Sequence, residues 1–279
     1  MFTLIDNLKD FEYFDKEIEN KKDVVGVDTE FRRTNRENMK LGLLQVFDGE
    51  EIFLIDPISI GPLEGGCSFL RSKGVLKIFH SFREDIESIH SWTGDFINHV
   101  YDTQLAEAIL GREYSPSYQD LVMQMTDISL DKGETRSNWL RRPLTDSQLK
   151  YAALDVEYLI HIFNEQKNEL LESDKYSWVI QETEFHIENF SLQNNFEKIV
   201  RENLTKEEEK FLLDKTNSIV LSLSREFRVN PTLLLSKKNQ KDFIRITFKE
   251  GLQHALQLLS PWKKNLLGNP VTNLIRNYK

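Results

Sequence analysis

The order of hydrophobic patterns along the chain constrains its fold more than any other feature. Residues 23–31, 41–47 and 51–55 are β-rich runs joined by short turns, which is typical of antiparallel strands. A strand pattern at 75–79 is then followed by a helix pattern at 83–92. Strands that alternate with helices are usually added to a sheet in parallel. The expected fold class is therefore α/β, a mixed sheet with flanking helices.

The later part of the chain has a helical pattern. One long helix is expected over residues 145–172, because its apolar residues recur every three to four positions. A polar stretch at 194–204 reads as a link, and Thr205 with Glu208 forms a capping-box signature for a new helix. We therefore expect two domains, an α/β domain over residues 1–190 and a small all-α domain over residues 200–279.

The net charge of −9 conceals an asymmetry between the two ends of the chain. Residues 201–279 carry 15 Lys and Arg against 8 Asp and Glu, a net charge of +7, so residues 1–200 carry −16. An acidic N-terminal part and a basic C-terminal part indicate two modules with different functions. The alternative is two solvated surfaces whose charges are unrelated.

Cysteine content and hydropathy favour a cytoplasmic protein. Cys67 is the single cysteine, so an internal disulfide is excluded. No run of 18 apolar residues is present, and the first residues lack the basic start and apolar stretch of a secretory signal. We expect no association with a membrane, and nothing in the sequence indicates an obligate protein partner.

Asp28 and Glu30 are the first candidate functional residues. Two positions apart on a strand, they project from the same face and lie side by side. Carboxylates this close repel each other unless a cation lies between them or one is protonated. Hard divalent ions suit such a pair, although two acids at an exposed strand end would look the same in sequence.

Three further residues fit the same chemistry. Tyr151 and Asp155 are four positions apart on the expected long helix, so they share a face that lies away from its apolar stripe. Asp85 opens the helix at 83–92 directly after a strand, where α/β sheets commonly build their sites. Each signal alone also describes an ordinary solvated acid.

A family resemblance connects these positions. It is carried by five segments, in the same order and approximate spacing as in the family. They are DTEF at 28–31, LGLLQ at 41–45, FHSFREDIESI at 79–89, YDTQ at 101–104 and KGETRSNWLRRPLTDSQLKYAALDVEYL at 132–159. Over residues 1 to about 170 the chain resembles ribonuclease D, of the DEDDy 3′→5′ exonuclease family. The resemblance implies an RNase H-like fold.

The resemblance also implies a role for each residue. Asp28, Glu30, Asp85 and Asp155 match the carboxylates that hold two divalent metal ions, Mg²⁺ or Mn²⁺, and Tyr151 matches the tyrosine that orients the attacking water. Two ions can clamp the attacking and leaving oxygens of an in-line displacement. The expected activity is stepwise release of 5′-mononucleotides from RNA with a free 3′ end, in maturation of tRNA precursors or other structured RNA.

The neighbouring residues have weaker signals. Thr29 and Phe31 flank the carboxylate pair and are candidate substrate-binding residues. Phe31 is either a stacking surface for the terminal base or a core residue. His80 is a candidate contact to sugar or phosphate, or a structural hydrogen-bonding group. Arg136, Arg141 and Arg142 either touch the RNA backbone or belong to a solvated loop.

The basic tail resembles the helicase-and-RNase-D C-terminal (HRDC) domain, through LLSPWKKNLLGNPVTNLI, more loosely than the front resembles its family. The family commonly has two copies, and this chain has room for one. A patch for RNA, or a solubilising face, is expected at Lys237, Lys238, Lys241, Lys249, Lys263 and Lys264. Two alternative functions stay open, a related exonuclease that acts on DNA and a non-catalytic RNA-binding protein.

Overall fold

The computed structural model describes residues 2–35, 38–63, 65–130, 133–134, 136–191 and 203–278. The expected polar link at 194–204 therefore lies almost wholly outside the described residues. The chain forms two compact units. The first comprises Met1–Gln104 and Pro116–Glu169, and the second Leu105–Ser115 and Leu170–Lys279.

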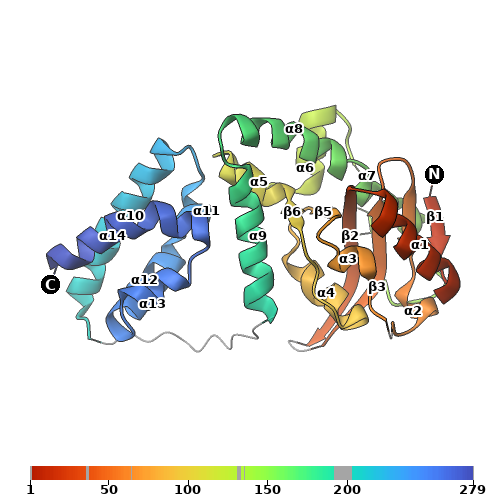
Figure 1. Ribbon diagram of the computed structural model, residues 1–279, viewed down its shortest axis with the longest axis horizontal. Coiled ribbons are helices and arrows are strands. Elements are labelled where there is room, and N and C mark those ends of the chain that lie inside the picture. The colour runs from red at the N-terminus through yellow and green to blue at the C-terminus, as the bar shows by residue number, and fades with distance from the viewer. Residues whose placement is uncertain are drawn as a thin grey trace. The chain divides into compact units, whose positions relative to one another are not determined.

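The first unit is built on a six-stranded sheet with the order β1-β4-β3-β2-β5-β6 (Figure 1). Pairs β2–β3 and β3–β4 are antiparallel, whereas β1–β4, β2–β5 and β5–β6 are parallel. The expected mixed sheet is thus confirmed. The strands are β1 (Phe2–Ile5), β2 (Val24–Asn35), β3 (Asn38–Phe47), β4 (Ile52–Ile55), β5 (Leu76–Phe79) and β6 (Val100–Asp102).

Helices flank this sheet on both sides (Figure 1). Its central strands are fully buried at Val25, Val27, Leu43 and Leu54, as expected for a sheet covered on two faces. The helices of this unit are α1 (Leu8–Lys21), α2 (Pro57–Ile60), α3 (Ser68–Arg71), α4 (Arg83–Thr93), α6 (Tyr118–Thr126), α7 (Asp146–Glu157) and α8 (Leu159–Glu172), and α5 (Thr103–Ile109) leads into the second unit.

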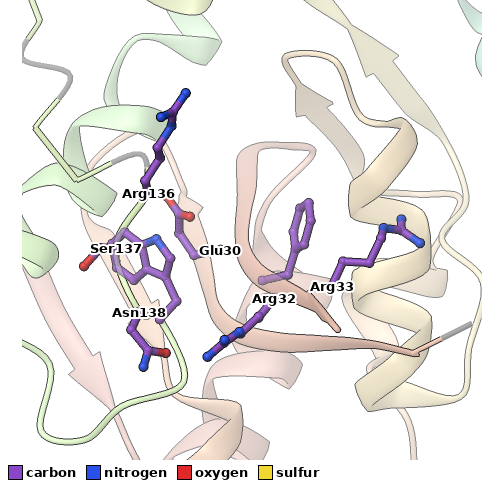
Figure 2. A pocket seen from close by; sticks show the side chains of 8 residues that line it. Glu30, Arg32, Arg33, Arg136, Ser137 and Asn138 are labelled. Carbon is purple, nitrogen blue, oxygen red and sulfur yellow. The ribbon is translucent and has the colours of Figure 1, made fainter. Parts of the chain in front are cut away.

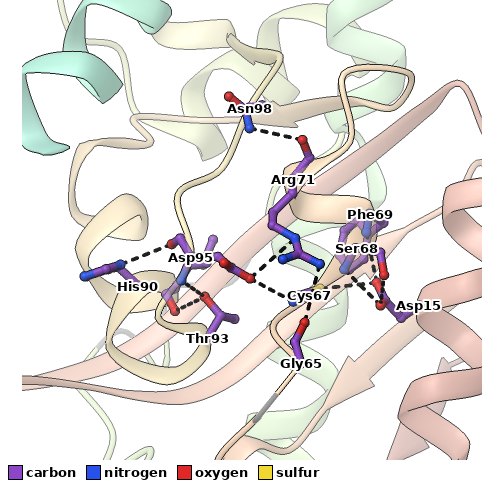
Figure 3. A network of polar contacts seen from close by, with 11 residues as sticks. Asp15, Gly65, Cys67, Ser68, Phe69, Arg71, His90, Thr93, Asp95 and Asn98 are labelled. Atoms are coloured by element: carbon purple, nitrogen blue, oxygen red, sulfur yellow. Dashed lines mark hydrogen bonds and ion pairs between the residues drawn. The ribbon is translucent and has the colours of Figure 1, made fainter.

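A buried carboxylate joins α1 to α3. Asp15 accepts hydrogen bonds from the backbone N–H and hydroxyl of Ser68 at 2.9 and 2.7 Å, and from the N–H of Phe69 at 2.9 Å (Figure 3). These are N–H groups that the start of a helix leaves without partners. Cys67 is buried beside them, with its thiol 3.4 Å from Asp15, and so belongs to this packing.

The prediction of one long helix over residues 145–172 is wrong in one respect. The helix is interrupted at Tyr158, between α7 and α8. The hydroxyl of Tyr118 interacts with the helical backbone at this point. Periodicity could not reveal the break, since the apolar stripe continues across it.

The second unit is helical, which confirms an all-α C-terminal part. Its helices are α9 (Tyr176–Ser191), α10 (Lys206–Glu226), α11 (Pro231–Leu235), α12 (Lys237–Lys249), α13 (Leu252–Gln257) and α14 (Pro261–Tyr278). The capping box of Thr205 and Glu208 is present at the start of α10. Among the described residues, no helix combines the length and apolar character needed to cross a membrane.

A buried acid organises the second unit. Glu182 on α9 accepts hydrogen bonds from Ser260 at 2.5 Å, from the Trp262 indole at 2.8 Å and from the Lys263 ammonium at 2.6 Å. The rings of Trp178 and Trp262 also stack at 5.0 Å. Lys263 is therefore engaged inside the fold and does not belong to an exposed basic patch.

Candidate metal and nuclease site

Strand β2 carries the first two carboxylates. Alternation along this strand puts Gly26, Asp28 and Glu30 on one face. A Cβ on Gly26 would lie 3.2 Å from the Val156 carbonyl oxygen and 3.1 Å from the Leu159 Cβ, so α7 and the start of α8 pack closely on that face. The Asp28 and Glu30 side chains therefore point towards the side of the sheet that α7 covers.

Helix α7 brings the third carboxylate to the same place. The helix begins with a complete capping box, in which Thr145 and Gln148 satisfy each other's backbone N–H groups. One carboxylate oxygen from each of Asp28, Glu30 and Asp155 lies within 4.8 Å of the others. The fold thus brings together Asp28, Glu30 and Asp155, which are separated by more than 120 positions of chain.

Asp85 reaches this cluster from the other side of β2. Strand β5 pairs with β2 only as far as Gly26, which leaves the following residues of β2 with an open edge where α4 begins. There the Thr29 hydroxyl donates a hydrogen bond of 2.5 Å to Asp85. Asp85 lies outside the group of three, but its charge acts on Asp28 and Glu30.

The environment of the four acids disfavours their charged forms. Burial, then the charges of Asp155 and Asp85, raise the pKa of Glu30 to about 9. Burial raises the pKa of both Asp85 and Asp155 to about 7. The pKa of Asp28 is also raised, first by burial and then by the surrounding carboxylates.

This arrangement fits a divalent cation. Mutually repelling carboxylates in a partly buried site are stabilised by a cation between them. The donor set consists of oxygen atoms only, which suits Mg²⁺ or Mn²⁺ rather than a soft metal. Asp28, Glu30 and Asp155 are the residues that could hold such an ion directly, with Asp85 beside them.

Tyr151 completes the set. Its hydrogen bond to Asp155 lowers the pKa of that carboxyl and so opposes the effect of burial. Its ring lies 6.1 Å from that of Trp139, in the loop before α7. Trp139 in turn packs on Gly42, where an added Cβ would be 2.8 Å from the Trp139 carbonyl oxygen. The phenol is thus positioned by β3 and the loop together.

A hollow of about 530 Å³ adjoins Glu30. Arg33 points away to α4, where it pairs with Glu87 at 2.7 Å, whereas Arg32 points towards Asn138 (Figure 2). Arg32 and Arg136 are exposed, and no ion pair to either is found within the described parts of the chain. The hollow is lined by Glu30, Phe31, Arg32, Arg33, Arg136, Ser137, Asn138 and Trp139.

The three residues expected to bind substrate lie in different environments. Phe31 is half-buried and lines this hollow. The hydroxyl of Thr29 is engaged with Asp85. The ring of His80 has Nδ1 2.9 Å from the Thr103 hydroxyl and Nε2 3.0 Å from the Pro116 carbonyl oxygen. Substrate contacts by Thr29 and His80 would have to replace these bonds, and they stay predictions.

Sequence reasoning missed several structural supports of the site. Arg142 binds Asp56 with two contacts of 2.6 Å and the Gly42 carbonyl oxygen at 2.6 Å, so it fixes the Trp139 loop rather than facing solvent. Gln45 is the cross-strand partner of Asp28, and neither of its side-chain polar atoms has a hydrogen-bond partner among the residues that the structure describes. The LGLLQ motif is the signal that could have identified Gln45, whereas no local pattern could have identified Tyr118.

The comparisons with known proteins agree with this fold. The 3′-5′ exonuclease family matches residues 2–171. Ribonuclease D of Xanthomonas oryzae pv. oryzae is 40% identical over 160 residues, which cover 57% of this chain and 44% of that protein. The chain thus spans less than half the length of this curated relative.

Two solved structures share the fold. The crystal structure of Escherichia coli RNase D, an exoribonuclease involved in structured RNA processing, aligns with a TM-score of 0.65 at 24% identity, over 99% of this chain and 75% of that one. Brucella melitensis NrnC with bound Mg²⁺ aligns with a TM-score of 0.55 at 22% identity, over 70% of this chain and 96% of that one.

The mixed sheet with its flanking helices defines the class, an α/β fold that the chain shares with Escherichia coli RNase D. The chain belongs to the 3′-5′ exonuclease family. The resemblance to ribonuclease D is confirmed by two ribonuclease D relatives that are each 40% identical to this chain, over 160 and 138 aligned residues.

Proposed function

We propose that this protein is a metal-dependent 3′→5′ exoribonuclease of the ribonuclease D type. The observation that carries the proposal is the convergence of Asp28, Glu30 and Asp155 within 4.8 Å, beside Asp85 and a tyrosine. Membership of the 3′-5′ exonuclease family supports the polarity of the reaction. The solved relative with bound Mg²⁺ supports the choice of a divalent ion.

The proposed site holds two ions, Mg²⁺ or Mn²⁺, with Asp28, Glu30, Asp85 and Asp155 as ligands. When bound, the ions supply positive charge to the phosphate and to the attacking and leaving oxygens. Tyr151 donates or accepts a hydrogen bond that orients the attacking water. Water displaces the 3′ oxygen of the preceding nucleotide, so each cycle releases one 5′-mononucleotide and leaves a new 3′ hydroxyl.

The substrate that we propose is structured RNA with a short single-stranded 3′ end, such as a tRNA precursor. The exoribonuclease relative that acts in structured RNA processing supports this choice. Phe31 and the guanidinium groups of Arg32 and Arg136 line the approach to Glu30, and a phosphate backbone attracts such cations. A cytoplasmic location accords with the single cysteine.

Residues 1–190 are proposed as the nuclease domain and residues 200–279 as an HRDC-like domain that assists RNA binding. The basic character of the tail supports this division. Helix α9 falls within the first range but packs against α14, so a nuclease fragment should be cut before α9.

The test uses the purified full-length chain with a 3′-labelled and a 5′-labelled RNA that carry a single-stranded 3′ tail. We expect a ladder shortened from the 3′ end, 5′-mononucleotides as product, and loss of both in EDTA. Asp155→Asn should lower kcat by at least about a hundredfold, because the variant loses a direct ligand. A matched DNA oligonucleotide distinguishes the DNA-directed alternative.

The non-catalytic alternative makes the opposite prediction. A scaffold would bind the RNA equally well with EDTA and with Mg²⁺, and no fragment would appear. Glu184→Gln, which changes an exposed acid on α9, serves as a control for the loss of one negative charge. Equal cleavage by wild type and Asp155→Asn would refute the proposed site.

A further inference from the structure

The interruption between α7 and α8 has a defined cause. In a continuous helix the N–H of Tyr158 would donate to the Leu154 carbonyl oxygen, four residues earlier. The Tyr118 hydroxyl lies between these two groups instead. It donates to the Leu154 carbonyl oxygen at 3.2 Å and accepts from the Tyr158 N–H at 3.1 Å. A side chain inserted into the helical ladder in this way kinks a helix.

Tyr118 is itself firmly held. It is the first residue of α6, whose N-cap, Ser117, accepts a hydrogen bond from the Asp120 N–H at 3.1 Å, and its side chain is 7% exposed. The His80 ring lies 5.8 Å from the Tyr118 ring and contacts the Pro116 carbonyl oxygen at 3.0 Å. The turn that carries Tyr118 is therefore anchored to the end of β5.

The anchored hydroxyl acts next to a proposed metal ligand. Leu154, whose carbonyl it binds, directly precedes Asp155, which closes the group of three carboxylates. The charges on Asp155 and Asp28 both contribute to a raised pKa of Tyr118, after burial, so the phenol is close to the cluster. Mg²⁺ tolerates little departure from octahedral geometry, so the placement of this last turn of α7 matters for binding.

We propose that Tyr118, anchored by His80, is a positioning residue for Asp155. By replacing the helical bond between Leu154 and Tyr158 with a phenol bridge, it sets where the Asp155 carboxylate lies relative to Asp28 and Glu30. It acts through Asp155 and has no contact with the RNA in this role. The inference rests on the proposed function, because it takes Asp155 as a metal ligand.

The test is Tyr118→Phe, which removes one oxygen and keeps the ring. Mg²⁺ binding to the RNA-free protein is measured by isothermal titration calorimetry and should weaken by about tenfold, as expected when a group that orients a ligand is lost. At fixed Mg²⁺, kcat should fall by a similar factor while KM for RNA is unchanged. Tyr114→Phe, at a tyrosine that is 40% exposed, is the matched control.

A second measurement reports on the bridge without metal or RNA. In ¹⁵N-labelled, metal-free protein the amide signals of Tyr158 and Asp155 should move in Tyr118→Phe and stay in Tyr114→Phe. His80→Phe, which removes the anchor but keeps a ring, should weaken Mg²⁺ binding, and the double variant with Tyr118→Phe should be no weaker than Tyr118→Phe. If Tyr118→Phe does not fold, the Mg²⁺ affinity of folded His80→Phe tests the inference in its place.

The outcomes separate this inference from the proposed function. Wild-type protein that neither binds Mg²⁺ nor cleaves RNA would refute both. Wild-type protein that does both, with Mg²⁺ affinity and kcat of folded Tyr118→Phe within twofold of it, would overturn the inference alone. If Tyr118→Phe does not fold, a folded His80→Phe variant that binds Mg²⁺ as tightly as wild type would likewise overturn the inference alone.

Discussion

The four carboxylates have pKa values that only the folded site can produce. Glu30 has a pKa of about 9 and Asp155 of about 7, because burial and mutual repulsion disfavour their charged forms. In an unfolded chain these groups titrate near 4. Each acid therefore binds a proton more tightly in the folded state, which makes both stability and metal binding depend on pH.

The sign of the pH dependence follows from this difference. A group with a raised folded-state pKa stabilises the protein below its unfolded pKa, and the contribution is lost as pH rises through the folded value. Without divalent ions we therefore expect the melting temperature to fall between about pH 5 and pH 9. Differential scanning calorimetry in EDTA measures this, and saturating Mg²⁺ should flatten the profile.

Binding of the metal should also release protons. At pH 7 the site is partly protonated, since the pKa values of Asp85 and Asp155 are about 7 and that of Glu30 is about 9. Apparent Mg²⁺ affinity should thus rise with pH over this window. An affinity that is constant from pH 6 to pH 9 would contradict these pKa values.

The arginines around the hollow should differ in their effect on RNA binding. Arg32→Ala and Arg136→Ala each remove a cation without a carboxylate partner among the described residues, so each should weaken RNA binding. The slope of log affinity against log salt should fall by about 0.7 per lost contact for single strands. Binding is measured by fluorescence anisotropy in EDTA.

Arg33→Ala provides the comparison within the same hollow. Its guanidinium is paired with Glu84 and Glu87, so its charge is already balanced by protein. We expect a smaller change in the salt slope than for Arg32→Ala. An equal or larger change would mean that RNA displaces the ion pairs.

Among the structural elements, β3 and the loop before α7 are packed backbone against backbone. A Cβ on Gly42 would lie 2.8 Å from the Trp139 carbonyl oxygen and 3.1 Å from that of Glu30. Because backbone atoms surround it on both sides, Gly42→Ala should destabilise the protein by about 1–3 kcal/mol. Chemical denaturation measures the change.

A helical glycine gives the contrasting case. Gly268 lies inside α14, and an added Cβ would meet nothing within 4 Å. Gly268→Ala should stabilise the protein by up to about 1 kcal/mol, because alanine loses less conformational freedom in a helix. Opposite signs for the two Gly→Ala variants would confirm that packing at Gly42, and not glycine content, is decisive.

For the molecule as a whole, the chain divides into two compact units, and a buried acid organises the second. Glu182 holds α9 to α14 through Lys263, Ser260 and Trp262. Despite burial, Lys263 and His186 keep the pKa of Glu182 well below its usual value. Glu182→Gln leaves the Lys263 ammonium without its carboxylate in a largely buried site. A loss of about 3–5 kcal/mol is expected when one partner of such a pair is removed.

The loss of stability in Glu182→Gln should be confined to the second unit. In differential scanning calorimetry we expect the transition of that unit to move to lower temperature, while the transition that Mg²⁺ stabilises stays in place. A common shift of both transitions would show that the units unfold together.

The periodicity of single helices and strands was sufficient to predict the fold class and the placement of several site residues. Strand alternation put Asp28 and Glu30 on one face, helical spacing put Tyr151 beside Asp155, and the order of patterns gave the mixed sheet. These predictions succeeded because each depends on the period of a single element. The capping box at Thr205 was found in the same way.

Contacts between distant segments were decided by the tertiary structure. The hydrogen bond from Thr29 to Asp85 depends on where β5 stops pairing with β2, and the break at Tyr158 depends on a tyrosine 40 positions earlier. Neither leaves a periodic signal, because packing of the core fixes the register between such segments. The residues of the site could thus be named from sequence, whereas the bonds that hold them required the fold.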